Sequence, residues 1–189
     1  PPPPLLRWPA VPIRSASALV NAVPIVTALT PSCAWPPWLY GGTVFRTLNV
    51  LDEANRGALG IDVATSIPAA RVVAFLGQMI DLHGRPDAIR CDNGPELTSQ
   101  CFTDWCRDQD IEIRFIQPGK PDQNAYIERF NRTYREEVLS AYLFDSLNEV
   151  REITAEWLER CNEIRPHDAL GSLPPARYRE QLLAAETPV

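Results

Sequence analysis

Acidic residues are missing from the first part of this sequence: no Asp or Glu precedes Asp52, and all 24 lie from that position onward. Residues 1–44 also lack lysine and hold ten of the nineteen prolines. Proline at this density interrupts helix interiors and central strands, because it fixes φ and donates no backbone hydrogen bond. We therefore expect residues 1–43 to contribute little to a regular core.

Closely spaced cysteines and long apolar runs are absent as well. The five cysteines include no Cys-x-x-Cys pair, and an odd number is a poor disulfide framework, so we expect reduced thiols in a cytosolic protein. The longest apolar stretch, 17–30, is broken by Asn21 and Pro24 and is shorter than the roughly 20 residues that cross a bilayer, which argues against a membrane protein. A net charge of -6 argues against a uniformly basic surface that coats nucleic acid, but it is compatible with a local basic strip.

From residue 44 onward the pattern predicts an α/β domain. The predicted elements are strands over 44–51 and 58–64, a helix over 68–82, a strand over 88–91, a helix over 96–109, a strand over 111–116, a helix with Tyr126, Phe130 and Tyr134 on its core side, and a helix over 147–161. This order is typical of an α/β fold with a mixed sheet. We divide the chain into a Pro-rich segment (1–43), a core (44–162) and a C-terminal extension (163–189).

Two carboxylates stand at positions suited to chemistry on phosphodiesters. Asp92 follows a short predicted strand, and Glu128 lies in a predicted helix, with 35 residues between the two. Cutting and joining DNA needs two divalent ions about 4 Å apart, one on the attacking oxygen and one on the leaving oxygen. Carboxylate oxygens are the natural protein ligands for Mg²⁺. A strand-end Asp and a helical Glu can both face such a site.

Five segments of the chain resemble the integrase-type catalytic core of bacterial insertion-sequence DDE transposases, which is related in fold to retroviral integrase and ribonuclease H. They are Phe-Arg-Thr-Leu-Asn-Val-Leu-Asp (45–52), Asp-Asn-Gly-Pro-Glu (92–96), Ile-Gln-Pro-Gly-Lys-Pro (116–121), the stretch from Gln-Asn-Ala-Tyr-Ile-Glu to Tyr-Arg-Glu-Glu (123–137) and Arg-Pro-His-Asp-Ala-Leu-Gly (165–171). The resemblance implies a ribonuclease H-like fold with a mixed five-stranded sheet flanked by helices. It also implies Mg²⁺-dependent DNA cleavage and strand transfer during transposition.

Site residues and partners follow from the same resemblance. Asp92 and Glu128 would be catalytic residues and ligands of two Mg²⁺ ions, with Mn²⁺ as a substitute. The expected DNA-binding residues are Asn93, Lys120, Asn124, Arg129, Arg132 and Arg135, because basic and amide side chains contact phosphates. The expected partners are element-end and target DNA and further copies of the chain on DNA, in the bacterial cytoplasm and at the nucleoid when DNA is bound.

The first acid of the family's three has no counterpart in the matching position. It is expected near Cys33, where residues 30–34 read Thr-Pro-Ser-Cys-Ala, and a thiol cannot bridge two Mg²⁺ ions as a carboxylate does. We therefore expect a first strand that is damaged or missing, and a chain that is inactive as written. Asp52 is an alternative first acid, although it ends the second strand of an antiparallel pair and should point away from the site.

Two readings of the first 43 residues and three of the whole chain stay open at this stage. The segment is either out of frame or disordered, or it is a genuine Pro-rich linker. Besides a transposase core, the chain could be a non-catalytic DNA-binding or subunit-interaction remnant, or a pseudogene product that folds poorly. His167 in Arg-Pro-His is expected to be structural, holding the C-terminal segment in place.

Overall fold

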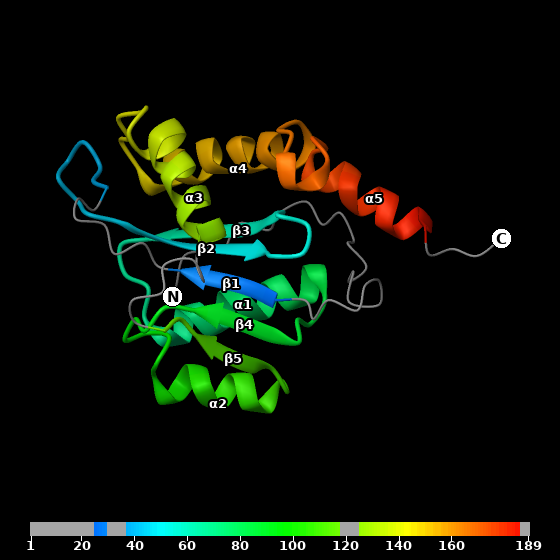
Figure 1. The fold of residues 1–189 in the computed structure, drawn as a ribbon. Helices are drawn as coiled ribbons and strands as arrows, with labels where there is room; N and C mark the ends of the chain where they lie inside the picture. The colour runs from blue at the N-terminus through cyan, green and yellow to red at the C-terminus, as the bar shows by residue number, and fades with distance from the viewer. Residues whose placement is uncertain (1–24, 30–36, 118–124, 186–189) are drawn as a thin grey trace.

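A single mixed sheet forms the centre of the molecule (Figure 1). The computed structural model describes residues 25–29, 37–117 and 125–185. The five strands are β1 (Ile25–Leu29), β2 (Arg46–Asp52), β3 (Ala58–Ala64), β4 (Ala88–Cys91) and β5 (Glu112–Phe115), in the spatial order β3-β2-β1-β4-β5. β1 is antiparallel to β2 and parallel to β4, so it joins an antiparallel hairpin to a parallel pair.

The prediction of a damaged or missing first strand is wrong for the backbone of residues 25–29. β1 pairs with β2 from Val26 opposite Asp52 to Leu29 opposite Asn49. The strand comes from the Pro-rich segment, but its own five residues contain no proline and begin with the β-branched run Ile-Val-Thr, which favours extended backbone. The average proline content of 1–44 concealed this short window between Pro24 and Pro31.

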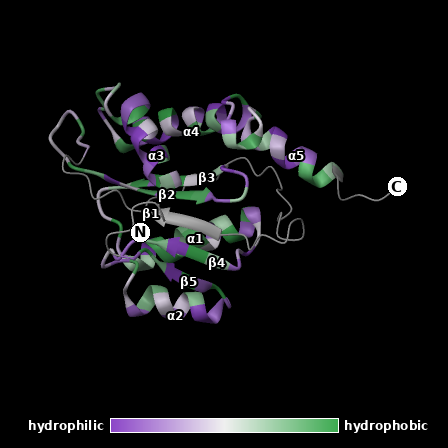
Figure 2. Ribbon diagram, viewed as in Figure 1, coloured by the Kyte–Doolittle hydropathy of each residue, from purple (hydrophilic) through white to green (hydrophobic). Residues whose placement is uncertain are grey.

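Two hydrophobic cores lie on opposite faces of the sheet. α1 (Ala69–His83) and α2 (Gln100–Asp108) bury their apolar sides with Leu48, Val50 and Ile89. On the other face, α3 (Ala125–Tyr134) and α4 (Leu147–Glu163) pack over alternate residues of the hairpin, including Leu51 and Ile61. Strands β2 and β3 are correspondingly green in Figure 2, whereas the helices show both green and purple faces. This alternation follows from the period of two in a strand.

The predicted hairpin, helices and strands are confirmed to within a few residues, with three differences. α2 begins at Gln100 rather than 96, because the Ser99 hydroxyl accepts a hydrogen bond from the Phe102 amide and caps the helix there. α3 passes into a π-helix, η3 (Arg135–Leu139), and the C-terminal extension contains η4 (Asp168–Leu170) and α5 (Pro175–Ala185). Tyr126 is 50% exposed, so its predicted place in the core is wrong.

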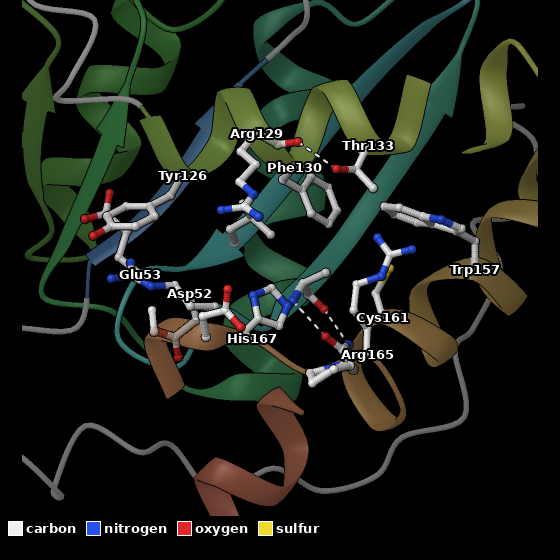
Figure 3. Close-up of a pocket in the computed structure, with 17 residues that line it drawn as sticks. Asp52, Glu53, Tyr126, Arg129, Phe130, Thr133, Trp157, Cys161, Arg165 and His167 are labelled. Carbon is white, nitrogen blue, oxygen red and sulfur yellow. Dashed lines mark hydrogen bonds between the residues drawn. The ribbon is translucent and has the colours of Figure 1, made fainter. Parts of the chain in front are cut away.

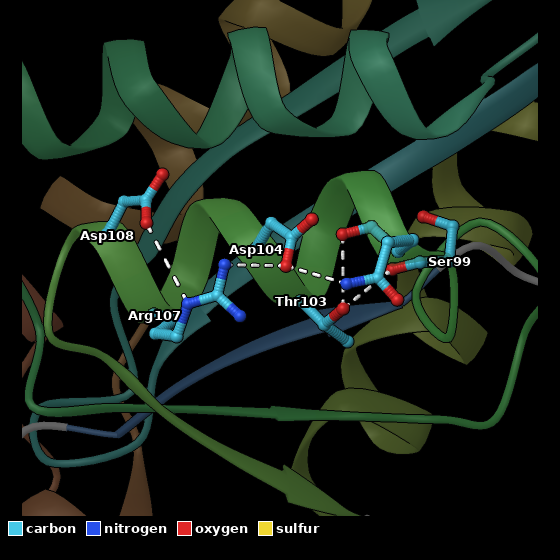
Figure 4. A network of polar contacts seen from close by, with 6 residues as sticks. Ser99, Thr103, Asp104, Arg107 and Asp108 are labelled. Atoms are coloured by element: carbon cyan, nitrogen blue, oxygen red, sulfur yellow. Dashed lines mark hydrogen bonds and ion pairs between the residues drawn. The ribbon is translucent and has the colours of Figure 1, made fainter.

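The exposed side of α2 carries a network of short-range polar contacts (Figure 4). Arg107 forms an ion pair with Asp104 at 2.7 Å, and Asp104 also accepts a hydrogen bond from Gln100 at 2.7 Å. Exposed pairs of this kind contribute little to stability, typically about 0–1 kcal/mol. They give this helix a solvated face. None of the described helices is long and apolar enough to span a membrane.

Candidate acid site and adjoining cavity

Asp92 lies where β4 ends, next to the centre of the sheet. Its Oδ1 accepts a hydrogen bond of 3.0 Å from the Gly94 amide, and a Cβ added at Gly94 would sit only 3.0 Å from that oxygen. The side chain is half-buried. Burial raises the pKa of Asp92, the Gly94 hydrogen bond lowers it, and the neighbouring Glu96 carboxylate raises it. This carboxylate is therefore positioned by a tight turn and is partly desolvated.

The register of β1 against β4 identifies the position beside Asp92. Ala28 pairs with Cys91 in the parallel ladder, so the next residue of each strand, Leu29 and Asp92, stand at the same level. A carboxylate is absent from that position, where the chain has leucine. Cys33, near which the first acid was expected, lies outside the described residues, so that placement stays a prediction.

Asp52 does not approach the level of Asp92. It pairs with Val26, three residues along β1 from Leu29, which corresponds to roughly 10 Å of strand. Its carboxylate accepts hydrogen bonds from the Ala54 amide at 2.8 Å and from the Asn55 side chain at 2.9 Å. Burial raises the pKa of Asp52, and hydrogen bonds from the backbone amides of Ala54 and Asn55 oppose the rise. Asp52 thus belongs to the β2–β3 turn, which argues against the stand-in interpretation.

Glu128 is exposed in the first turn of α3. Arg132 and Arg135 follow at i+4 and i+7, and both are exposed as well, so the three side chains lie along one side of the helix. Arg129 points elsewhere, into the cavity described below (Figure 3). An acid in the first turn of a helix interacts favourably with the helix dipole, which gives Glu128 a local structural reason for its position in addition to any chemistry.

The other predicted DNA-binding residues are only partly described. Asn93 is exposed and its amide donates a hydrogen bond of 3.2 Å to the Ile116 carbonyl oxygen, which ties the turn after β4 to the end of β5. Lys120 and Asn124 lie outside the described residues. The structure thus brings Asn93 beside Asp92, but it does not test the roles of the remaining pair.

A buried pair of amide side chains lies beneath α3 and was not predicted from the sequence. Asn49 of β2 is fully buried and donates a hydrogen bond of 2.6 Å from Nδ2 to Oδ1 of Asn131. Asn49 stands opposite Leu29 in the antiparallel register, and Asn131 lies one turn beyond Glu128. Within the described ranges, Asn49 Oδ1 has no hydrogen-bond partner. The detectable signal was a lone amide in the apolar run Leu48-Asn49-Val50.

The acids present do not complete a metal site. Among residues 25–29, 37–117 and 125–185, no group of three or more His, Cys, Asp or Glu side chains is arranged to hold a metal ion. Two bridged divalent ions need several carboxylates in one place, and the position level with Asp92 supplies none. The described residues therefore do not fit a two-metal centre.

A cavity of about 220 Å³ lies beside α3 (Figure 3). At about 3.6 residues per helical turn, Tyr126 and Phe130, which line it, point away from the side of α3 that carries Glu128. One side of α3 lines it through Tyr126, Arg129 and Phe130, and α4 contributes Trp157. The β2–β3 turn and the segment 165–169 close the remaining sides. Sequence analysis did not identify this cavity, because it assigned the aromatic residues of α3 to the core as one stripe.

Comparison with known proteins gives two family matches with the same description, Integrase core domain, over residues 37–121 and 109–175. The chain is 43% identical over 133 residues to the uncharacterized 39.2 kDa protein of insertion element IS476 from Xanthomonas euvesicatoria, covering 70% of this chain and 38% of that protein. It is 37% identical over 140 residues to the uncharacterized 31.7 kDa protein of insertion element IS407 from Burkholderia multivorans, covering 74% of this chain and 50% of that protein. The chain thus spans at most half the length of these two relatives.

Solved structures show the same fold at low identity. The catalytic core domain of HTLV-2 integrase, solved in complex with magnesium, superposes with a TM-score of 0.63 at 18% identity, covering 83% of this chain and 96% of that one. The catalytic core domain of BIV integrase gives a TM-score of 0.64 at 15% identity, covering 88% of this chain and all (100%) of that one. These likenesses establish a ribonuclease H-like arrangement of the sheet and helices.

Proposed function

The chain belongs to the integrase core family of insertion-element transposases, and on that premise we propose that it is a transposase core that binds DNA but does not cut or join it. The family's reaction is hydrolysis of a phosphodiester at the element end, followed by attack of the freed 3′-hydroxyl on target DNA. In that scheme Asp92 and Glu128 are the second and third acids. In this chain Asp92 and Glu128 keep those positions, but they do not support cleavage or joining of DNA.

One observation carries the loss of activity: leucine occupies the β1 position level with Asp92. An apolar side chain cannot ligate a divalent ion, so the bridging carboxylate of a two-metal site has no source there. The absence of any acid before Asp52 supports the same reading from the sequence. We derive no step through Mg²⁺ or Mn²⁺ for this chain as written.

Retained DNA binding is proposed for the surface beside Glu128. Arg132 and Arg135 are exposed there, and exposed arginines suit phosphate contacts. Asn93 is exposed in the turn after β4. Lys120 and Asn124 join the proposal from their place in the sequence alone.

The test uses a short duplex carrying the ends of the insertion element that encodes the chain. We expect no cleavage or joining with Mg²⁺ or Mn²⁺ in excess, together with salt-sensitive binding measured by fluorescence anisotropy. Arg132→Gln should reduce the slope of log K against log salt by about 1. Arg107→Gln on α2, at the far edge of the sheet, is the matched control and should leave the slope unchanged. Joined products from the unaltered chain would overturn the proposed inactivity.

A subunit-interaction role is the second candidate, and an exposed apolar patch favours it. Tyr40 and Leu143 are 80% and 83% exposed, and the Tyr40 amide donates a hydrogen bond of 2.7 Å to the Phe144 carbonyl oxygen, so the two loops lie together. Contiguous apolar exposure of this kind marks protein interaction sites. We expect a concentration-dependent oligomer in sedimentation that Leu143→Asp weakens. A monomer at all concentrations would remove this candidate.

A further inference from the structure

The cavity beside α3 has an apolar floor and a cationic rim. Its floor is formed by Leu51, Ala58, Trp157 and Cys161, each less than a tenth exposed. Phe130 rests against Trp157 with ring centroids 5.3 Å apart. An apolar cavity of about 150 Å³ is large enough to take up benzene, so about 220 Å³ leaves room for one planar ring system.

Arg56, Arg129 and His167 also line the cavity, and Figure 3 shows Arg129 and His167 among the lining residues. Burial lowers the pKa of His167, and the charges of Arg165, Arg129 and Arg56 lower it further, while Asp168 opposes them. Three arginines thus disfavour the charged form of this imidazole, and Asp168 favours it.

The acids of the cavity are largely satisfied by other groups. Asp52 accepts hydrogen bonds from the Ala54 amide and the Asn55 side chain. Glu53 forms an ion pair of 3.1 Å with Arg90, outside the cavity. Asp168 is the exposed acid on the rim. Asp52 interacts electrostatically with Arg56, so it offsets part of the positive charge on that side of the cavity.

The two arginines nearest the mouth keep donors available. Within the described part of the chain, the Arg129 guanidinium has no hydrogen-bond or ion-pair partner. Arg56 stacks on the Tyr126 ring, with its guanidinium carbon 3.4 Å from the ring centroid, which leaves the N–H groups at its edge free to point outward. Arg165, in contrast, is held by Glu137 at 2.6 Å.

We propose that this cavity binds a single nucleotide, with the base in the apolar cavity beside Phe130 and the 5′-phosphate between Arg129 and Arg56. Bases stack on aromatic side chains whatever their identity, and guanidinium groups bind phosphate with paired N–H groups. The inference rests on the proposed DNA-binding function, because DNA lying along α3 would supply the nucleotide.

A nucleotide fits these observations better than a protein segment. The cavity holds one ring and ends in cations, whereas a peptide segment from a second copy would need a longer apolar groove. The α3 helix also separates this cavity from Glu128 by its own width, so DNA on one side of the helix could place an unpaired nucleotide on the other.

The test is calorimetric titration of the whole chain, without divalent metal, by three probes: deoxyadenosine 5′-monophosphate, deoxyadenosine and inorganic phosphate. We expect the nucleotide to bind at least tenfold more tightly than either part alone. Arg129→Gln should weaken nucleotide binding about tenfold, the value of a charge-assisted hydrogen bond, and leave deoxyadenosine unaffected. Ala169→Phe, which adds bulk to the exposed cavity wall, should abolish binding of the nucleotide and of deoxyadenosine.

Arg107→Gln on α2 is the matched control for charge removal, and thermal unfolding of each variant verifies its fold. Equal affinity for nucleotide and phosphate, or no effect of Ala169→Phe, overturns the proposal. So does self-association that Ala169→Phe abolishes, since the cavity would then serve a subunit contact. Because no metal or joining step is involved, failure here leaves the proposed inactivity untouched, and joined DNA products would leave this result untouched.

Discussion

Replacing Leu29 by Asp should rebuild an acidic pair across β1 and β4. Adjacent parallel strands are about 4.8 Å apart, and Leu29 and Asp92 stand at the same level. Two carboxylates at that separation repel by about 3 kcal/mol at an effective dielectric constant of 20. Without metal, the Leu29→Asp variant should therefore unfold about 6–12 °C below the unaltered chain, given about 2–4 °C per kcal/mol for a domain of this size.

Divalent metal should reverse that loss. A ligand at a hundred times its dissociation constant stabilises the folded state by about 2.7 kcal/mol, so saturating Mg²⁺ should raise the melting temperature of Leu29→Asp by about 5–10 °C. The assay is thermal unfolding at pH 7.5 with and without Mg²⁺. Leu29→Asn has the same size without the charge and should show neither the repulsion nor the gain.

An equal response of the Asp and Asn variants to Mg²⁺ would refute the register argument. A gain that survives Asp92→Asn in the Leu29→Asp background would refute it as well, because the metal would then be bound elsewhere. If metal binding returns, the Leu29→Asp variant is the one to use in the DNA-joining assay.

Three further predictions concern stability. Tyr134→Phe should cost about 1–2 kcal/mol in urea unfolding, because the Tyr134 hydroxyl is 2.7 Å from that of buried Thr154 and its loss leaves one polar group unpaired; combined with Thr154→Val the loss should shrink. Gly60→Ala should lower thermal stability by about 1–3 kcal/mol, because the new Cβ would lie 2.8 Å from the Met79 sulfur. Burial lowers the pKa of His83, so its contribution to stability is present above the unfolded value near 6.5 and is lost as pH falls toward the folded value. Melting temperatures from pH 7.5 to 5.0 should show this slope, and His83→Gln should flatten it.

Each of these has a result that contradicts it. A Tyr134→Phe protein as stable as the unaltered chain would mean that the hydroxyl pair contributes nothing. Gly60→Ala without loss would show that Met79 moves aside at no cost. An unchanged pH slope in His83→Gln would assign the acid sensitivity to other groups.

The outline of the fold was predictable from residue 44 onward because its signals are local. The hairpin strands, α1 and α4 follow from apolar periodicity with a period of two or 3.6. β1 was not predictable in the same way, since five residues inside a Pro-rich segment carry no periodic signal and acquire their structure from pairing with two distant strands. Its place in the sheet is a tertiary effect.

The candidate site likewise has a part that was predictable from local sequence and a part that depends on tertiary structure. Asp92 and Glu128 were found because their flanking residues resemble a known family. The level of Leu29 beside Asp92 could not be read from spacing, because it depends on strand register. The cavity was also out of reach, since it combines one side of α3 with the β2–β3 turn and the segment after α4, which are far apart in sequence.

The central position of β1 has a consequence for the order of assembly. The β2–β3 hairpin and the β4–β5 pair join through β1 in the sheet. During synthesis β1 leaves the ribosome first, yet its ladder is complete only after Ala88 to Cys91 have emerged to pair with Ile25 to Ala28. Until then the chain exposes unpaired strand edges that can associate with other chains. The yield of folded protein should therefore depend on how soon β4 emerges from the ribosome. It should also depend on chaperones that bind β1 until β4 is available for pairing.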